Sequence, residues 1–225
     1  FTGTAGTNPG SSPQAALILG GDGNYYGTTS GGGSGNFGTI FKMTPAGVQT
    51  SLISFTGTTG LNLGSSPQGP LTLGADGNYY GTTVSGGSGG GFGTIFQLTP
   101  GGVLTTLVNF TGTSGAVLGT APSGVLAQAA DGNFYGTTNS GGASNFGTVF
   151  KVTPAGVLTN LASFTGTTGA LPGVTPTGGL FAGRDGCFYG VTAAGGVYFQ
   201  GTLFRVAPDG SVVSLYSFSG RGEGL

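Results

Sequence analysis

The sequence predicts an all-β protein, a β-propeller of four blades of about 54 residues, each a meander of four antiparallel strands. Three observations predict this class. The motif DGNYYGTT at Asp22 recurs at Asp76, at Asp131 as DGNFYGTT and at Asp185 as DGCFYGVT, at intervals of 54, 55 and 54 residues. Glycine and proline punctuation recurs with it, and no segment between these turn signals reaches the length of an ordinary capped helix.

Each repeat contains four segments with strand chemistry. In the first repeat, residues 15–19 (AALIL) form an apolar run that ends at the turn signal of residues 20–23 (GGDG). Residues 24–29 (NYYGTT) are aromatic and β-branched, and residues 39–44 (TIFKMT) follow a glycine loop. Residues 48–55 (VQTSLISF) follow a Pro-Ala-Gly turn. We expect the first segment to lie at the propeller axis.

A single meander cannot bury both of its faces, so we expect neighbouring blades to stack on one another. The expected blades span residues 1–54, 55–109, 110–163 and 164–217, and residues 218–225 open a fifth repeat. Small residues suit the crowded axis at Ala15, Gly69, Gly124 and Gly178. Leucines are expected between blades at Leu17, Leu71, Leu126 and Leu180. The blades either form a four-bladed ring, form half of an eight-bladed ring made by two chains, or belong to a longer array; a β-solenoid is the competing fold.

Composition excludes several function classes. The net charge is −1 with only five basic residues, too few and too scattered to follow a nucleic-acid backbone. The longest apolar run is five residues, against about 20 for a membrane-spanning helix. There is no histidine, and the single Cys187 cannot form an internal disulfide or a multi-thiolate zinc site. We therefore expect no cofactor, no nucleic-acid partner and no membrane span, and we interpret Cys187 as a small packed residue.

The repeated units resemble a known family. YGTT (residues 26–29, 80–83 and 135–138) and GTIFKMTPAG (residues 38–47), with its copies GTIFQLTPGG and GTVFKVTPAG, resemble the GloVer tandem repeat of bacterial surface (choice-of-anchor) proteins. The last copy departs from the pattern, with Val191 in place of Thr and Gln200 inserted before the Gly-Thr pair. The resemblance implies a propeller-like fold and a secreted or cell-surface bacterial protein. It carries over no catalytic residue.

The recurring carboxylate is the first candidate site. An EF-hand calcium loop needs several oxygen ligands at alternate positions, whereas each copy here has one Asp beside Gly. Asp-Gly between two strands is a strong hairpin signal, so a turn is the favoured interpretation. The alternative is a ring of four carboxylates on one rim that attracts a cation, formed by Asp22, Asp76, Asp131 and Asp185.

Two glycine-rich motifs do not predict chemistry. The GxGxxG of residues 33–38 precedes a strand rather than a helix, and no Walker lysine follows it. The GxSxG of residues 86–90 centres on Ser88, but the chain has no histidine to act as its base. Asp209 lies in a PDG turn and Glu223 in the terminal tail, so neither predicts a glycosidase pair.

Aromatic and apolar residues offer the remaining candidates. The repeated tyrosines alternate like core residues, at Tyr26, Tyr80, Tyr135 and Tyr189. Apolar residues in the long connectors predict either a contact surface or local packing, and these are Leu61, Leu63, Val117, Leu118 and Leu171. We expect a non-enzymatic extracellular scaffold for binding or surface assembly. The alternatives are a carbohydrate-binding or carbohydrate-active propeller that uses its central opening, with a glycan or protein ligand, and a self-assembling structural subunit such as a homodimer.

Overall fold

The computed structural model describes residues 1–220, which form sixteen strands in four separate four-stranded antiparallel sheets. Within each sheet the spatial order follows the sequence order. The first sheet contains β1 (Ile18–Leu19), β2 (Tyr25–Thr29), β3 (Thr39–Met43) and β4 (Gln49–Ser54), and the second contains β5 (Thr72–Leu73), β6 (Tyr79–Thr83), β7 (Thr94–Leu98) and β8 (Leu104–Asn109). The third contains β9 (Ala127–Gln128), β10 (Phe134–Thr138), β11 (Thr148–Val152) and β12 (Leu158–Ser163), and the fourth contains β13 (Val174–Ala182), β14 (Phe188–Ala194), β15 (Thr202–Val206) and β16 (Val212–Ser217). The predicted four-stranded blades are confirmed.

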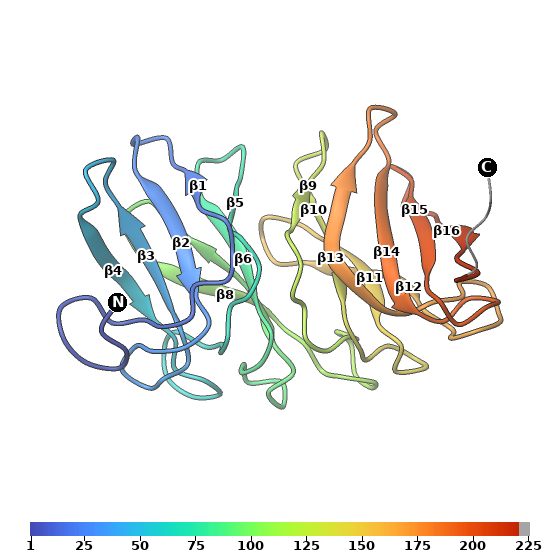
Figure 1. Cartoon of the computed structure of the whole chain (residues 1–225), viewed down its shortest axis with the longest axis horizontal. Helices are drawn as coiled ribbons and strands as arrows, with labels where there is room; N and C mark the ends of the chain where they lie inside the picture. Colours follow the sequence, from blue (N-terminus) through green and yellow to red (C-terminus); the bar gives the residue numbers. More distant parts are fainter. Residues whose placement is uncertain (221–225) are drawn as a thin grey trace.

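The four blades form an open arc. Figure 1 shows the first blade, in blue, and the last blade, in orange and red, at opposite ends of the longest axis of the molecule. The N-terminus lies beside the first blade. Of the arrangements considered from the sequence, the closed four-bladed ring is therefore not the one that the chain forms. In the described residues, no helix is long and apolar enough to cross a membrane.

In the first three blades, the first strand is shorter than its apolar run predicts. In the first blade only Ile18 and Leu19 pair with β2, although the run begins at Ala15. In the second blade, the residues before β5 bond to the neighbouring blade: the carbonyl of Gly69 accepts a hydrogen bond from Thr28 Oγ1 at 3.4 Å. The inner segment therefore joins two blades rather than completing one sheet. The last blade is the exception, because β13 pairs with β14 along most of its length.

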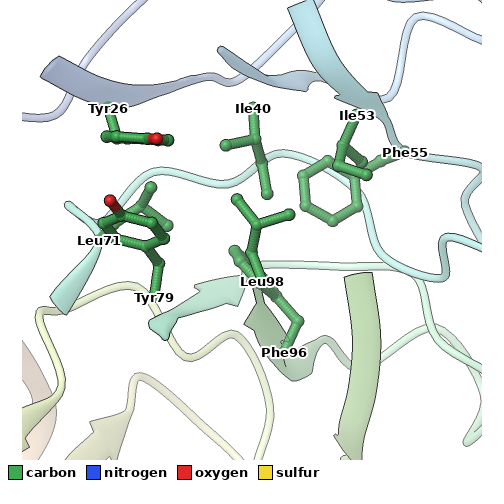
Figure 2. Close-up of a cluster of buried hydrophobic side chains, with 8 residues drawn as sticks. All are labelled: Tyr26, Ile40, Ile53, Phe55, Leu71, Tyr79, Phe96 and Leu98. Atoms are coloured by element: carbon green, nitrogen blue, oxygen red, sulfur yellow. The ribbon is translucent and has the colours of Figure 1, made fainter. Parts of the chain in front are cut away.

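Neighbouring blades pack face to face through three equivalent hydrophobic cores. Figure 2 shows the first, where Tyr26 lies over Tyr79 and Ile40 lies over Leu98. The tyrosine rings are stacked with centroids 4.2 Å apart. The same layer recurs with Tyr80 on Phe134 in the second core and Tyr135 on Phe188 in the third. Aromatic pairs of this kind add to the free energy of apolar burial, so these interfaces hold the array together.

Glycines at the axis allow the inner segments to approach one another. A Cβ on Gly124 would overlap the backbone of Gly179, and one on Gly69 would lie 2.9 Å from the carbonyl oxygen of Gly124. The crowding predicted for this strand is therefore real at Gly69 and Gly124. In the last blade the close approach falls on Gly179 instead of Gly178, which faces open space. Of the four leucines predicted to lie between blades, Leu71, Leu126 and Leu180 are buried, whereas Leu17 in the first blade is 42% exposed because no preceding blade of the chain covers it.

Candidate functional site

Each repeated aspartate closes its own hairpin. In the second blade, Asp76 Oδ1 accepts the backbone N–H of Asn78 at 3.1 Å, and Oδ2 accepts the Asn78 side-chain amide at 2.8 Å. The hydroxyl of Tyr80, four residues on, donates to the same Oδ2 at 2.7 Å. Gly77 has φ of 80°, a left-handed value that favours glycine. The motif DGNYY thus encodes a turn with its own hydrogen-bond donors.

The four aspartates do not share a site. The turn is repeated at Asp22, Asp131 and Asp185, where Oδ1 accepts the backbone N–H two residues on. Tyr26 and Tyr189 also donate to their own aspartates. Lys42 Nζ lies 3.8 Å from Asp22 Oδ2, an exposed ion pair that stabilises little. In residues 1–220 no three His, Cys, Asp or Glu side chains are grouped so that they could hold a metal ion.

Hydrogen bonding within the turn lowers the pKa of these carboxyl groups. At Asp22 the largest cause is the hydrogen bond from the Asn24 side chain, and Asn133 acts in the same way on Asp131. At Asp76 burial opposes the lowering, and the hydrogen bonds from Tyr80 and Asn78 outweigh it. A lowered pKa in the folded state means that deprotonation of the carboxyl favours folding.

We therefore expect acid to destabilise the protein. The stabilisation is present above the unfolded-state pKa of about 3.9 and is lost as the pH falls through the lower folded-state values. Urea midpoints measured between pH 7 and pH 2 are expected to fall below about pH 4. The variant Asp76→Asn is expected to be less stable than the parent at pH 7 and to lose less on acidification. A variant with an unchanged acid dependence would contradict the role of this carboxylate.

The tyrosines paired with these aspartates respond to base. Burial, followed by the hydrogen bond to Asp76, raises the pKa of Tyr80 to about 12. The pKa of Tyr26 is raised by burial, then by the neighbouring Tyr79 hydroxyl and then by the hydrogen bond to Asp22. Because the folded-state pKa exceeds the unfolded value of about 10, this stabilisation is complete below pH 10 and is lost as the pH rises toward 12. Tyrosinate absorbance and circular dichroism should therefore change together in this range. Ionisation of all eight tyrosines near pH 10 in a folded chain would contradict this.

A buried pair of threonine hydroxyls recurs in every blade, and sequence reasoning did not identify it. Thr138 Oγ1 lies 2.8 Å from Thr148 Oγ1, accepts the Thr148 backbone N–H at 3.2 Å and donates to the Ser140 carbonyl at 2.9 Å. The equivalent pairs are Thr29 with Thr39, Thr83 with Thr94, and Thr192 with Thr202. The signal was the fixed spacing of YGTT and the following Gly-Thr. These hydroxyls bond to one another and are buried, so they are structural.

The connector residues proposed as a contact surface divide into two groups. Leu171 is buried in the third core, so the contact-surface interpretation is wrong for it. Val117 is half-buried and packs against the second core, and Leu63 and Leu118 are half-buried as well. Leu61 alone of the five is fully exposed, at 92%. The other four residues are covered by local packing, because the glycines of each connector let it fold back on its blade.

Four sheets stacked through repeated aromatic cores, with turn residues in place of a shared site, define a propeller-like tandem-repeat protein. The chain belongs to the Gloeobacter/Verrucomicrobia repeat family, whose model matches residues 1–183 and 118–225. The two matches together cover the whole chain, so the resemblance found in the motifs is confirmed. No curated protein matches the chain.

Solved propellers of six or seven blades share the fold. A catalytically inactive variant of virginiamycin B lyase from Staphylococcus aureus, crystallised with quinupristin, matches with a TM-score of 0.54 and 13% identity over 97% of this chain and 59% of that one. An ulvan lyase of a polysaccharide lyase family matches with a TM-score of 0.55 and 12% identity over 91% of this chain and 54% of that one. A streptogramin B lyase matches with a TM-score of 0.51 and 16% identity over 88% and 53%. The chain thus spans less than two thirds of each.

Proposed function

We propose that the chain is a non-enzymatic repeat scaffold that acts outside the bacterial cell, where its blades present surfaces for binding and assembly. The observation that carries this proposal is the use of each repeated polar group within its own blade. Asp76 is occupied by Asn78 and Tyr80, and the threonine hydroxyls are occupied by each other. Repetition of these residues is therefore explained by folding alone.

The residue inventory supports the same proposal. The inactive virginiamycin B lyase carries alanine in place of a histidine, and this chain has no histidine at all. Histidine is the commonest general acid or base near neutral pH. Cys187, the one thiol, is buried, and burial raises its pKa, so it lacks the thiolate character of a nucleophile.

The carbohydrate alternative has less support from the geometry. A sugar-stacking role needs aromatic faces that are open to solvent. Tyr26, Tyr80 and Tyr135 are at most 1% exposed because they fill the cores between blades. These three tyrosines are thus committed to packing, and a glycan site would have to use other residues.

A ligand screen tests the proposal. The melting temperature is measured with calcium chloride and with a panel of neutral and acidic oligosaccharides, for the parent chain and for Asp76→Asn as the matched control. The proposal predicts the same melting temperature with and without each additive. A reproducible upward shift with calcium that Asp76→Asn abolishes would overturn it and assign a cation site to the turn. An upward shift with an oligosaccharide would favour the carbohydrate alternative.

A further inference from the structure

The two ends of the arc expose the two halves of an interface that the chain uses three times internally. At the first internal interface, the preceding blade contributes Tyr26, Ile40, Ile53 and Phe55, and the following blade contributes Leu71, Tyr79, Phe96 and Leu98 (Figure 2). By the repeat spacing, the last blade carries the first set as Tyr189, Leu203, Tyr216 and Phe218. The first blade carries the second set as Leu17, Tyr25, Phe41 and Met43.

Burial distinguishes the end faces from the internal ones. Leu17 is 42% exposed, whereas its equivalent Leu71 is 2% exposed. At the other end Phe218 is 41% exposed, whereas its equivalent Phe110 is fully buried. The chain therefore carries, at opposite ends, two apolar surfaces whose internal counterparts bind each other.

We propose that the last blade of one copy docks on the first blade of a second copy, head to tail, and forms a fourth interface of the internal type. This inference rests on the assembly role in the proposed function and names its partner, a second copy of this chain. The contact is heterologous, because two different surfaces meet. Tyr189 would lie over Tyr25 as Tyr26 lies over Tyr79 at the first internal interface.

The shapes of the two faces support the pairing. The first blade has a cavity of about 470 Å³ whose lining includes Leu17, Phe41, Met43 and Gln49. Leu98 and Leu104 stand at the positions of Met43 and Gln49 in the second blade, where the neighbouring blade covers them. On the last blade, Tyr216 occupies the position held by smaller side chains elsewhere, namely Ile53, Val108 and Ala162. A larger side chain on one face thus matches a hollow on the other.

Phe1 occupies part of the surface of the first blade on which the second copy would dock. Its ring packs on Phe41 with centroids 5.1 Å apart, in the arrangement that Phe55 makes with Phe96 at 5.4 Å. Phe1 thus fills the slot that the connector phenylalanine of a preceding blade fills elsewhere. Phe218 of an incoming copy would compete for that slot. Phe1→Ala leaves this slot to Phe218 of the incoming copy and is therefore expected to strengthen the association.

Two junctions per pair of copies would close an eight-bladed ring. Four blades already span 54–59% of the virginiamycin B lyase and ulvan lyase structures, and propellers have about 4 to 8 blades. A closed pair of chains therefore lies within the range of known propellers. If the curvature does not close the ring, the same junction generates longer open oligomers.

The experiment measures solution mass by light scattering and sedimentation up to about 0.5 mM chain, which detects even weak association. The parent chain of 21.7 kDa is expected at twice that mass or above, with the Phe1→Ala chain associating more tightly. Leu17→Glu and Leu203→Glu each disable one face and are each expected to be monomeric. Their equimolar mixture is expected to form a 1:1 complex, because each variant keeps the face that the other has lost. Leu61→Glu, on an exposed connector, is the control and should behave as the parent.

Three results would overturn the inference. A parent chain that stays monomeric over the whole concentration range would show that the end faces do not bind a second copy of the chain. Association that survives both glutamate variants, each shown to be folded by circular dichroism, would place the contact elsewhere. Loss of association with Leu17→Glu alone, with no effect of Leu203→Glu, would indicate two identical faces in contact. A monomeric parent leaves the ligand screen unaffected, so this failure is distinguishable from failure of the scaffold proposal.

Discussion

Replacing Phe110 with alanine is expected to lower the free energy of unfolding by about 3–5 kcal/mol. Phe110 is fully buried between the second and third blades, and its ring packs on Phe150 with centroids 5.5 Å apart. Removal of the ring leaves a cavity at the centre of an internal interface, and neighbouring sheets cannot collapse onto it without losing their own packing. A loss of this size is a large part of the stability of an ordinary domain.

The repeat supplies a matched control for this change. Phe218 holds the same position in the last blade, but it is 41% exposed and packs on Tyr216. The variant Phe218→Ala is expected to cost less than about 1 kcal/mol in the monomer. Both losses are measured by urea denaturation at a concentration where the chain is monomeric. Equal losses for the two variants would contradict the assignment of Phe110 to an interface that Phe218 lacks.

The second large effect is expected at the propeller axis, where Gly124→Ala should destabilise by about 3 kcal/mol or more. The added methyl group would overlap the backbone of Gly179, which belongs to the next blade. Backbone cannot move aside as a flexible side chain can, so the two inner segments must separate. Separation would also weaken the parallel bridge between Val125 and Gly179.

Gly21→Ala is the control for Gly124→Ala. A Cβ on Gly21 meets no atom within 4 Å, and Gly21 does not have a positive φ. The substitution is expected to change stability by no more than about 0.5 kcal/mol. Thermal melts of both variants test the pair. A Gly124→Ala chain as stable as Gly21→Ala would show that the inner segments are not in close contact.

Much of the fold could be predicted because the same pattern of turn and strand residues occurs four times in the sequence. The Asp-Gly pair, the aromatic strand and the glycine before TIF each recur at constant spacing, and each corresponds to a turn or strand in the structure. The blade boundaries follow from that period. The assignment of Asp76 to a hairpin also rests on local chemistry, because the donors lie within four residues of it.

Features that depend on how blades meet could not be read from the pattern. The closure of the arc depends on small rotations between sheets, which the residue types do not specify. Leu171 is buried and Leu61 is 92% exposed because they stand at different positions of equivalent connectors. The Leu171 carbonyl accepts the Thr165 N–H as the Asn62 carbonyl accepts the Thr56 N–H, so Leu171 corresponds to Asn62 and not to Leu61. The threonine pairs could not be predicted either, because the two hydroxyls of each pair lie on adjacent strands, ten or eleven residues apart in the sequence.

The central claim is that each blade is stabilised by its neighbours through a shared core, and that each end blade lacks one neighbour. Native-state hydrogen exchange, at a concentration where the chain is monomeric, tests this most directly. In such an array, local stability follows nearest-neighbour contacts. Amides of β7 and β11 are expected to exchange at least about tenfold more slowly than those of β3 and β15, a difference of ~1.4 kcal/mol. Equal protection of the amides of β3, β7, β11 and β15 in the monomer would contradict the claim.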